Sequence, residues 1–248
     1  MKLSAVGLSK SYTAHPVVNI DNVTFGEHGI EGLIGPNGAG KSTLLGCLTR
    51  RIPSTTGSVT FELDGHRHDL IALSSYQVAR LGLVKTNQRI QGFESLTIRD
   101  QLRMAGTLPQ KENWRTAWKP DPGDPDLEEM IGALMARFPF SDPDGYAKSA
   151  GEKKLVDILR CLAVRPKMLL MDEPTAGLPE EITREVMAIV REKVEAEELV
   201  VLIIEHDLEL IWNHCDYVHF LSEGEVLFQG APDEVKSNRV VAEKYMGV

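Results

Sequence analysis

The stretch GPNGAGKS, from Gly35 to Ser42, constrains the possible folds of this chain more than any other feature. It fits the pattern G-x-x-x-x-G-K-[ST] without a mismatch, and it stands between a short apolar run at 30–34 and leucines of helical spacing at 41–48. This order of strand, glycine loop and helix directs backbone N–H groups and the positive end of the helix at one anion. We therefore predict an α/β protein with the loop at the end of a buried strand.

The loop predicts a site for the phosphates of a nucleotide. Lys41 would place its charge on the outer phosphates, and the Ser42 hydroxyl would bind Mg²⁺. The residues expected to surround the phosphates are Gly35, Pro36, Asn37, Gly38, Ala39, Gly40, Lys41, Ser42 and Thr43. An ordinary glycine turn followed by a chance Lys-Ser pair is the alternative, but it would not account for the strand and helix on either side.

A second motif is the acidic pair Asp172-Glu173, which follows the apolar run Met168 to Met171. At the tip of a buried strand, Asp172 can hold Mg²⁺ through water, and Glu173 can polarise an attacking water as a general base. Many strands end in acidic residues, so the pair alone is a weak signal. Together with the phosphate loop, it predicts a site that hydrolyses a nucleotide.

The rest of the chain sets the domain organisation. Apolar runs alternate with amphipathic segments in both halves, whereas the middle is polar, rich in proline and mainly helical. We expect an α/β core at 1–86 and 151–248 and a helical part at 87–150. The expected strands are 3–8, 17–25, 30–34, 58–63, 168–171, 200–204, 217–221 and 225–228, and the expected helices are 41–48, 95–104, 127–138, 155–163, 180–195 and 208–212.

Composition narrows the partners and the cellular setting. The formal net charge of -9 argues against a general affinity for nucleic acid, which needs clustered Lys and Arg. No apolar run is long enough to span a bilayer. The three cysteines, Cys47, Cys161 and Cys215, form no CxxC pair, which favours a reducing, cytoplasmic setting without a disulfide framework.

With these motifs the chain resembles the ATP-binding-cassette (ABC) ATPase family over nearly its whole length. The resemblance implies a P-loop NTPase of ABC type, with a RecA-like mixed-sheet core, an antiparallel β portion and an inserted helical subdomain. It implies ATP and Mg²⁺ as cofactors. It also implies that two such subunits enclose two ATP molecules, so that the phosphate loop of one subunit faces the signature loop of the other.

The resemblance assigns roles to three further residues. Tyr12 is similar to the aromatic residue that stacks on adenine, Gln88 to the glutamine that contacts Mg²⁺ and the attacking water, and His206 to the histidine that contacts the γ-phosphate. Each also has an ordinary structural explanation, as a surface tyrosine, a solvated loop glutamine or a structural histidine.

The signature loop departs from the family pattern L-S-G-G-Q. The aligned residues are Lys148, Ser149, Ala150, Gly151 and Glu152. Ser149 and Gly151 keep the pattern, and the resemblance implies that they grip the γ-phosphate held by the partner subunit. Ala150 replaces a glycine, and its methyl group disfavours positive φ. Farther on, Pro179 stands where the family often has an aspartate.

Three segments resemble the ATPase subunits of branched-chain amino acid importers, including urea-type importers. They are TAGL at 175–178, IIEHDL at 203–208 and the tail from 230 onward. This resemblance implies membrane permease subunits, a second ATPase subunit and, indirectly, a solute-binding protein as partners, and a location on the inner face of the plasma membrane through the permease.

Two alternatives remain open. GEKK at 151–154 and DIL at 157–159 also resemble the soluble ATPase of iron–sulfur cluster assembly, in which Cys161, Cys215 or His214 could take part. A module that closes on ATP without useful turnover is the other alternative, suggested by the altered signature loop.

Overall fold

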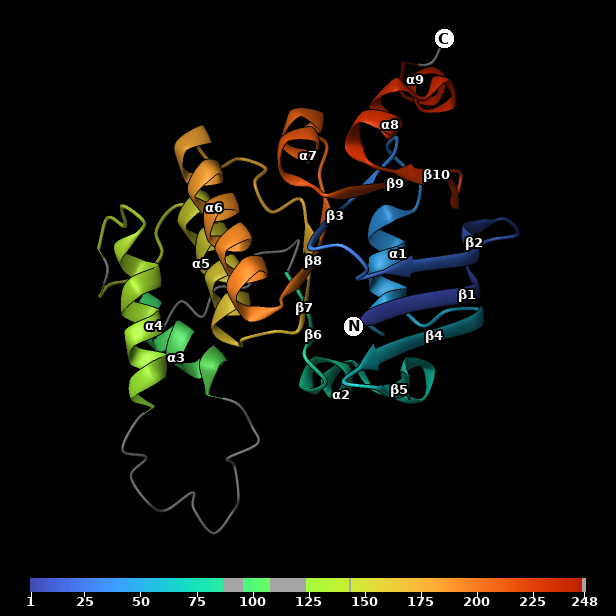
Figure 1. The fold of residues 1–248 in the computed structure, drawn as a ribbon. Helices are drawn as coiled ribbons and strands as arrows, with labels where there is room; N and C mark the ends of the chain where they lie inside the picture. Colours follow the sequence, from blue (N-terminus) through green and yellow to red (C-terminus); the bar gives the residue numbers. More distant parts are fainter. Residues whose placement is uncertain (87–95, 108–123, 143, 247–248) are drawn as a thin grey trace. The chain divides into compact units, whose positions relative to one another are not determined.

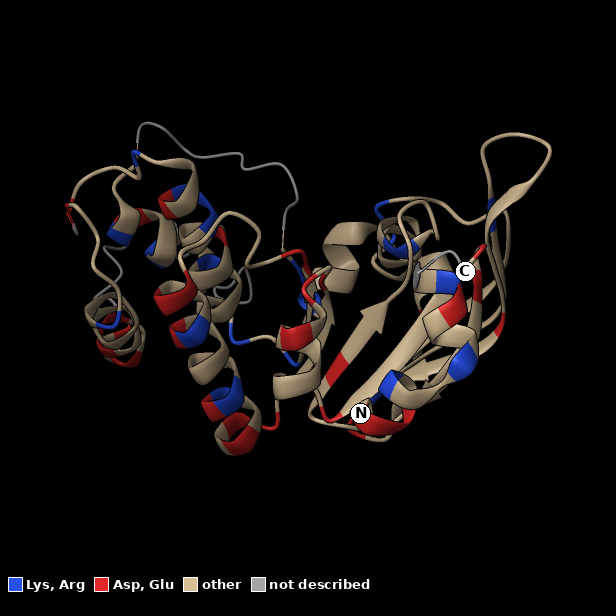
Figure 2. Cartoon of the chain, turned by 90° about the horizontal axis from the view of Figure 1, so that it is seen from above, with Lys and Arg blue, Asp and Glu red and all other residues tan. Residues whose placement is uncertain are grey.

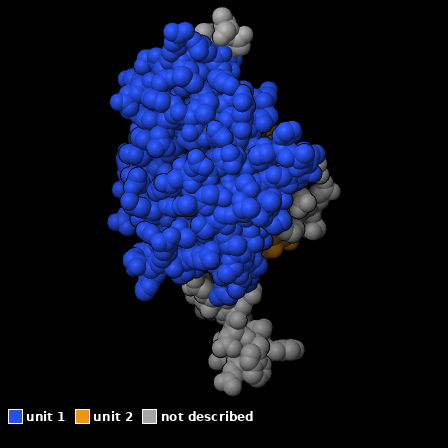
Figure 3. All heavy atoms as spheres, turned by 90° about the vertical axis from the view of Figure 1, so that its right-hand side faces the viewer, with its two compact units in different colours: residues 1–85, 167–174, 189–248 blue, residues 86–166, 175–188 orange. Residues whose placement is uncertain are grey.

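The computed structural model describes residues 1–86, 96–107, 124–142 and 144–246. The chain divides into two compact units: residues 1–85, 167–174 and 189–248 form the first, and residues 86–166 and 175–188 the second. Figure 3 shows a face made largely by the first unit. The second unit extends beyond the range 87–150 expected for the helical part, and the division drawn from the sequence stays a prediction.

The first unit contains a four-stranded antiparallel sheet in the order β2-β1-β4-β5 (Figure 1). Its strands are β1 (Lys2–Ser11), β2 (Pro16–Phe25), β4 (Thr56–Leu63) and β5 (His66–Asp69). Leu3 pairs with Phe25 on one side and Phe61 on the other, and all three side chains are fully buried. This alternation of buried and exposed positions fixes the register, since a slip of one residue would expose the buried set.

The second sheet has six strands in the order β10-β9-β3-β8-β7-β6. They are β3 (Ile30–Ile34), β6 (Leu83–Lys85), β7 (Met168–Asp172), β8 (Val200–Ile204), β9 (Tyr217–Ser222) and β10 (Glu225–Gly230). The five neighbouring strands β9, β3, β8, β7 and β6 run parallel to one another, and β10 pairs with β9 as an antiparallel hairpin. Strands β3 and β7 are buried at every position, as expected inside a parallel sheet, and the buried Glu31 of β3 is paired with His219.

Helix α1 (Lys41–Leu48) follows β3 through the glycine loop. Its Leu44, Leu45 and Leu48 are fully buried and belong to one apolar cluster with Leu3 and Phe61 of the antiparallel sheet. Each buried leucine contributes about 1.5–3 kcal/mol. The start of α1 is thus held in place by the core of the first unit, and the glycine loop with it.

The remaining helical segments include several that the sequence did not predict. In chain order the helical segments after α1 are η1 (Leu70–Ala72), α2 (Ser75–Arg80), α3 (Ile98–Gly106), α4 (Pro125–Ala136), α5 (Ala150–Ala163), α6 (Glu180–Glu197), α7 (Leu208–His214), α8 (Pro232–Ser237) and α9 (Arg239–Met246). Strands β5 and β6 and helices α2, α8 and α9 were not expected. They are short, and short elements carry little periodic signal.

Helices α3, α4 and α5 pack together in the second unit. Side chains cap their first turns: Thr97 for α3, Asp124 for α4 and Ser149 for α5. The prediction that the helix at 155–163 begins at residue 155 was wrong by five residues, because the capping group lies at Ser149.

Figure 2 shows acidic and basic residues interspersed along the helices. No helix of the described residues is long and apolar enough to cross a membrane.

Candidate active site

A pocket of about 250 Å³ opens beside the glycine loop in the first unit. Its lining residues are Val17, Asn37, Gly38, Ala39, Gly40, Lys41, Ser42, Thr43, Glu173 and His206. Seven of them belong to the loop and the start of α1, and Glu173 and His206 come from the segments after β7 and β8. The fold thus brings the two sequence motifs, more than a hundred residues apart, to one cavity.

Two glycines of the loop are required by close approach of other backbone. A Cβ at Gly35 would lie 1.9 Å from the carbonyl oxygen of Leu221, and a Cβ at Gly40 would lie 2.4 Å from that of Val17. Gly40 also has a φ of 101°, a conformation that L residues with a side chain rarely adopt. The loop therefore keeps its shape because strands on both sides press against its backbone.

Lys41 is almost fully buried at the pocket wall. Its Nζ donates to the carbonyl oxygens of Gly35 at 2.6 Å and Pro36 at 3.0 Å. Burial lowers the pKa of Lys41, while the nearby carboxylates of Glu173 and Asp172 act in the opposite direction. The loop carbonyls thus hold an ammonium group next to the amides of residues 38–43, where the sequence predicts phosphate.

Asp172 ends β7 with a buried carboxylate. The Ser42 hydroxyl donates to its Oδ1 at 3.2 Å, and Lys85 Nζ lies 2.9 Å from its Oδ2. Oxygens of a serine and a carboxylate are donors that suit Mg²⁺, so the pair expected to hold the metal does lie together. Lys85 was not anticipated. It ends β6, a three-residue strand that the sequence did not predict and that pairs in parallel with β7.

Glu173 and His206 face each other at the pocket. His206 Nε2 lies 2.9 Å from Glu173 Oε1, and both side chains are partly open, at 44% and 30% exposed respectively. The Glu173 N–H donates to the carbonyl oxygen of Ile204 at 2.9 Å, and its φ is 49°. A positive φ in a residue other than glycine is a strain that often marks functional positions. A carboxylate beside a histidine can orient and deprotonate a water molecule.

The signature segment lies in the second unit, at the start of α5. Ser149 is the N-cap, and its hydroxyl accepts the N–H of Glu152 at 3.0 Å. The Glu152 carboxylate accepts in return from Ser141, Lys148 and Ser149 at 2.6–3.1 Å. These hydrogen bonds, led by that of the Ser141 hydroxyl, lower the pKa of Glu152 to about 2. Glu152 thus holds the loop in shape.

Ala150, which replaces a glycine of the family pattern, lies at a position where positive φ is not needed. Ala150 is the first residue of α5 and has no positive φ, so its methyl group meets no conformational penalty. Gly151 follows within the helix, and a Cβ there would find its nearest neighbour, Leu178 Cδ2, at 3.6 Å. Lys154 donates to the carbonyl oxygen of Ala176 at 3.0 Å and ties the loop before Pro179 to the same helix.

For Tyr12 and Gln88 the pocket gives no support to the assigned roles. Tyr12 is 60% exposed, with Lys10 Nζ 5.0 Å from its ring centroid, and it is not among the residues that line the cavity. Gln88 lies outside the described residues. Their assigned roles stay predictions.

The cysteines have the surroundings of structural residues. All three are buried, and burial raises the pKa of Cys215 to about 12. Such a thiol is a poor nucleophile and a poor metal ligand. Among the residues that the structure describes, no group of three or more His, Cys, Asp or Glu side chains could hold a metal ion.

Comparison with known proteins gives a consistent result. The model of the ABC transporter family matches residues 18–176. The high-affinity branched-chain amino acid transport ATP-binding protein BraF of Pseudomonas aeruginosa is 28% identical over 99% of this chain and 97% of its own length. The corresponding LivG of Escherichia coli is 29% identical, with the same coverage. The iron–sulfur alternative is not supported by these relatives.

Solved structures agree on the fold. The ADP conformation of MJ1267, an ATP-binding cassette of an ABC transporter, superposes with a TM-score of 0.79 at 26% identity and covers both chains completely. A nucleotide-free cassette from an ABC transporter gives 0.78 at 25% identity. The predicted fold, an α/β cassette with an antiparallel β portion and a helical part, is confirmed.

Proposed function

The chain belongs to the ABC transporter family as an ATP-hydrolysing nucleotide-binding cassette, and we propose that it powers the import of branched-chain amino acids or related solutes, including urea-like ones. The observation that carries its chemistry is the pocket in which the glycine loop, Lys41, Glu173 and His206 converge.

The proposed hydrolysis uses the groups of this pocket in turn. The amides of residues 38–43 and Lys41 hold the phosphates. Glu173 takes a proton from a water molecule as the water attacks the γ-phosphorus in line, and the bond from that phosphorus to the β–γ bridging oxygen breaks, so that ADP leaves. His206 orients Glu173 and the transferred group. The catalytic effect comes mainly from positioning and charge stabilisation, because the donors are fixed by the fold beforehand.

Mg²⁺ fits the donor set beside the phosphates. Ser42, Asp172 and Gln88 would hold it, Asp172 through water, and a bound Mg²⁺ would neutralise phosphate charge. In this arrangement Lys85 balances the charge of the second oxygen of Asp172 and keeps that carboxylate in place.

A second ATPase subunit, identical or homologous, would complete the site. Ser149, Ala150, Gly151 and Glu152 of one subunit would then approach the γ-phosphate held by the other, and Tyr12 would stack on the adenine. The space around Gly151 supports this arrangement, because the packing of its own chain does not require a glycine there.

The solute class and the remaining partners rest on the relatives, which span almost the whole chain and are named for branched-chain amino acid transport. We infer permease subunits in the membrane, a solute-binding protein outside it, and a position for this cassette on the inner membrane face. Nucleic acid is not a proposed partner.

Two substitutions test the chemistry. Lys41→Ala should abolish tight ATP binding. Glu173→Gln should bind ATP normally but lower kcat about 10²–10⁴-fold, because it removes the general base. ATP affinity and steady-state phosphate release measure both effects. Normal hydrolysis by Glu173→Gln would show that another group is the base.

Co-purification tests the transport role. The tagged chain would be isolated from detergent-solubilised membranes and, separately, from cytosol. Recovery of multi-span membrane chains with a second ATPase is the expected result. Recovery of a soluble scaffold alone would contradict the importer proposal and leave the nucleotide chemistry unaffected.

A further inference from the structure

Tyr245 of helix α9 contacts Gly35, the first residue of the phosphate loop. The Gly35 N–H donates to the Tyr245 hydroxyl at 3.0 Å, and this hydroxyl donates to the Gly35 carbonyl oxygen at 3.2 Å. A tyrosine hydroxyl has one proton to donate and can accept another, so a single side chain satisfies both backbone groups of Gly35. The two residues are 210 positions apart in the sequence.

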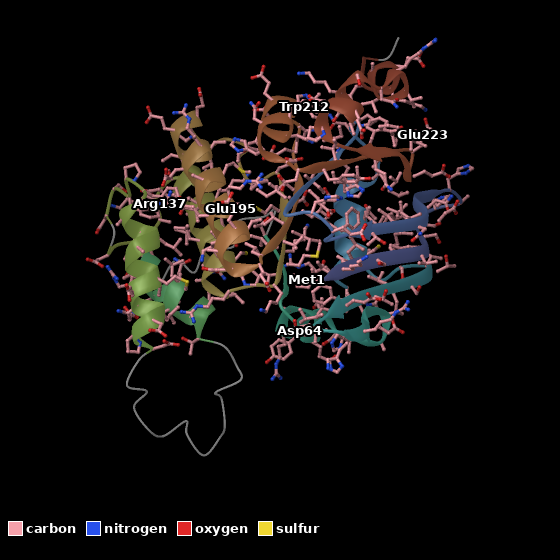
Figure 4. All side chains as sticks on the ribbon, viewed as in Figure 1. Met1, Asp64, Arg137, Glu195, Trp212 and Glu223 are labelled. Carbon is pink, nitrogen blue, oxygen red and sulfur yellow. The ribbon has the colours of Figure 1, made fainter. Side chains whose placement is uncertain are left out.

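Helix α9 is fixed to the first unit by further contacts. The Tyr245 ring lies 5.9 Å from that of Phe220 between centroids, and Val241 is buried. Lys244 donates to Glu223, which lies in the turn between β9 and β10 (Figure 4). These contacts limit the positions available to the hydroxyl, so that it meets Gly35 in a defined geometry.

Gly35 links this tyrosine to the lysine of the site. Its carbonyl oxygen accepts from Tyr245 and also from Lys41 Nζ, at 2.6 Å. A carbonyl oxygen has two lone pairs, and this one uses both. The position of the Gly35 carbonyl oxygen, together with that of Pro36, therefore sets where the Lys41 ammonium points, and Tyr245 donates to the same Gly35 oxygen.

We propose that Tyr245 is a positioning residue for nucleotide binding, which acts through the Gly35 peptide to aim Lys41 at the phosphates. The inference rests on the proposed function of the phosphate loop and adds a residue from the far end of the chain to it. Burial raises the pKa of Tyr245, against a smaller lowering by its bond to Gly35, so the hydroxyl keeps the proton that it donates.

Tyr245→Phe isolates the hydroxyl, because the ring and its packing against Phe220 remain. The Kd for MgATP should rise about two- to tenfold, the range that corresponds to one net hydrogen bond. Tyr217→Phe is the matched control: it removes a tyrosine hydroxyl from β9, where the ring stacks on His28, and should leave the Kd unchanged. Isothermal titration of the full chain measures both, and thermal unfolding without nucleotide reports stability.

A purely structural role gives a different pattern. If Tyr245 only anchored α9, Tyr245→Phe would lower the unfolding midpoint with and without ATP equally, and the Kd would not move; that result overturns the inference. An unchanged Kd in Tyr245→Phe with loss of binding in Lys41→Ala would refute only this inference. Absence of ATP binding in the unaltered chain would refute the proposed function and the inference together.

Discussion

The phosphate loop and the signature segment both contain glycines, but the two regions use them differently. At Gly35 and Gly40, an added Cβ would meet backbone oxygens of Leu221 and Val17 at 1.9 and 2.4 Å. At Gly151 the same addition finds nothing nearer than 3.6 Å. The first loop is therefore shaped by its own unit, whereas the second leaves space beside a helix start.

This difference shows that a glycine can be required by the folding of its own chain or can be independent of it. Where neighbouring backbone fills the space, glycine is a condition for folding, and a substitution disturbs the loop. Where the space is open in the chain alone and φ is not positive, as at Gly151, neither packing nor backbone conformation of the chain requires the glycine. The signature segment is held by side chains, chiefly Glu152 and Ser149, and this explains why Ala150 is accommodated there.

The largest effect is expected from Gly40→Ala. The clash with Val17 and the positive φ together should lower the free energy of unfolding by about 2–5 kcal/mol and abolish ATP binding. Denaturant unfolding and nucleotide titration measure this. Gly65→Ala is the control, since its φ is 77° but no atom lies within 4 Å of the added Cβ. Similar losses in both variants would mean that φ alone, and not the approach of Val17, sets the cost.

A smaller effect, confined to turnover, is expected from Gly151→Ala. Alanine favours helix, so stability should stay the same or rise by up to about 1 kcal/mol. The methyl group would stand where the partner's phosphate is proposed to lie, and kcat should fall about 10²-fold. Unchanged hydrolysis at unchanged stability would remove Gly151 from the proposed interface.

The smallest effect is expected from Glu152→Gln, although glutamine is the usual residue of the family pattern. In Glu152→Gln, the side-chain NH₂ would face backbone N–H groups that now donate to a carboxylate oxygen. The free energy of unfolding at pH 6 should therefore fall by about 1 kcal/mol. The folded-state pKa of Glu152 is lowered to about 2 from 4.5, so this stabilisation is present above pH 4.5 and disappears as the pH falls toward 2.

Urea unfolding of the unaltered protein and of Glu152→Gln, at pH 6 and at pH 3.5, measures this stabilisation. The difference in free energy of unfolding between the two proteins should be smaller at pH 3.5 than at pH 6. Glu129→Gln, an exposed position in α4, is the control and should show no such difference. A difference that is constant with pH would mean that the Glu152 charge contributes nothing to the loop.

The sequence by itself determined the parts of the site that are local in the chain. The loop from Gly35 to Ser42 and the pair Asp172-Glu173 were identified because glycine conformations and strand ends depend on adjacent residues. The main strands and long helices were predicted for the same reason, since periodicity reports burial directly. The contact of Glu173 with His206 was not visible in the sequence, although Glu173 was predicted from its place at a strand end and His206 from the family resemblance.

Only the tertiary structure decided which distant residues support these motifs. Lys85 reaches Asp172 across 87 positions because β6 and β7 pair in parallel, and Tyr245 reaches Gly35 across 210 because a short, weakly periodic helix packs beside the sheet. Such long-range contacts depend on the order of the strands and on where the helices pack. Strand order and helix packing are set by burial of the whole core, whereas a local motif depends only on its own few residues.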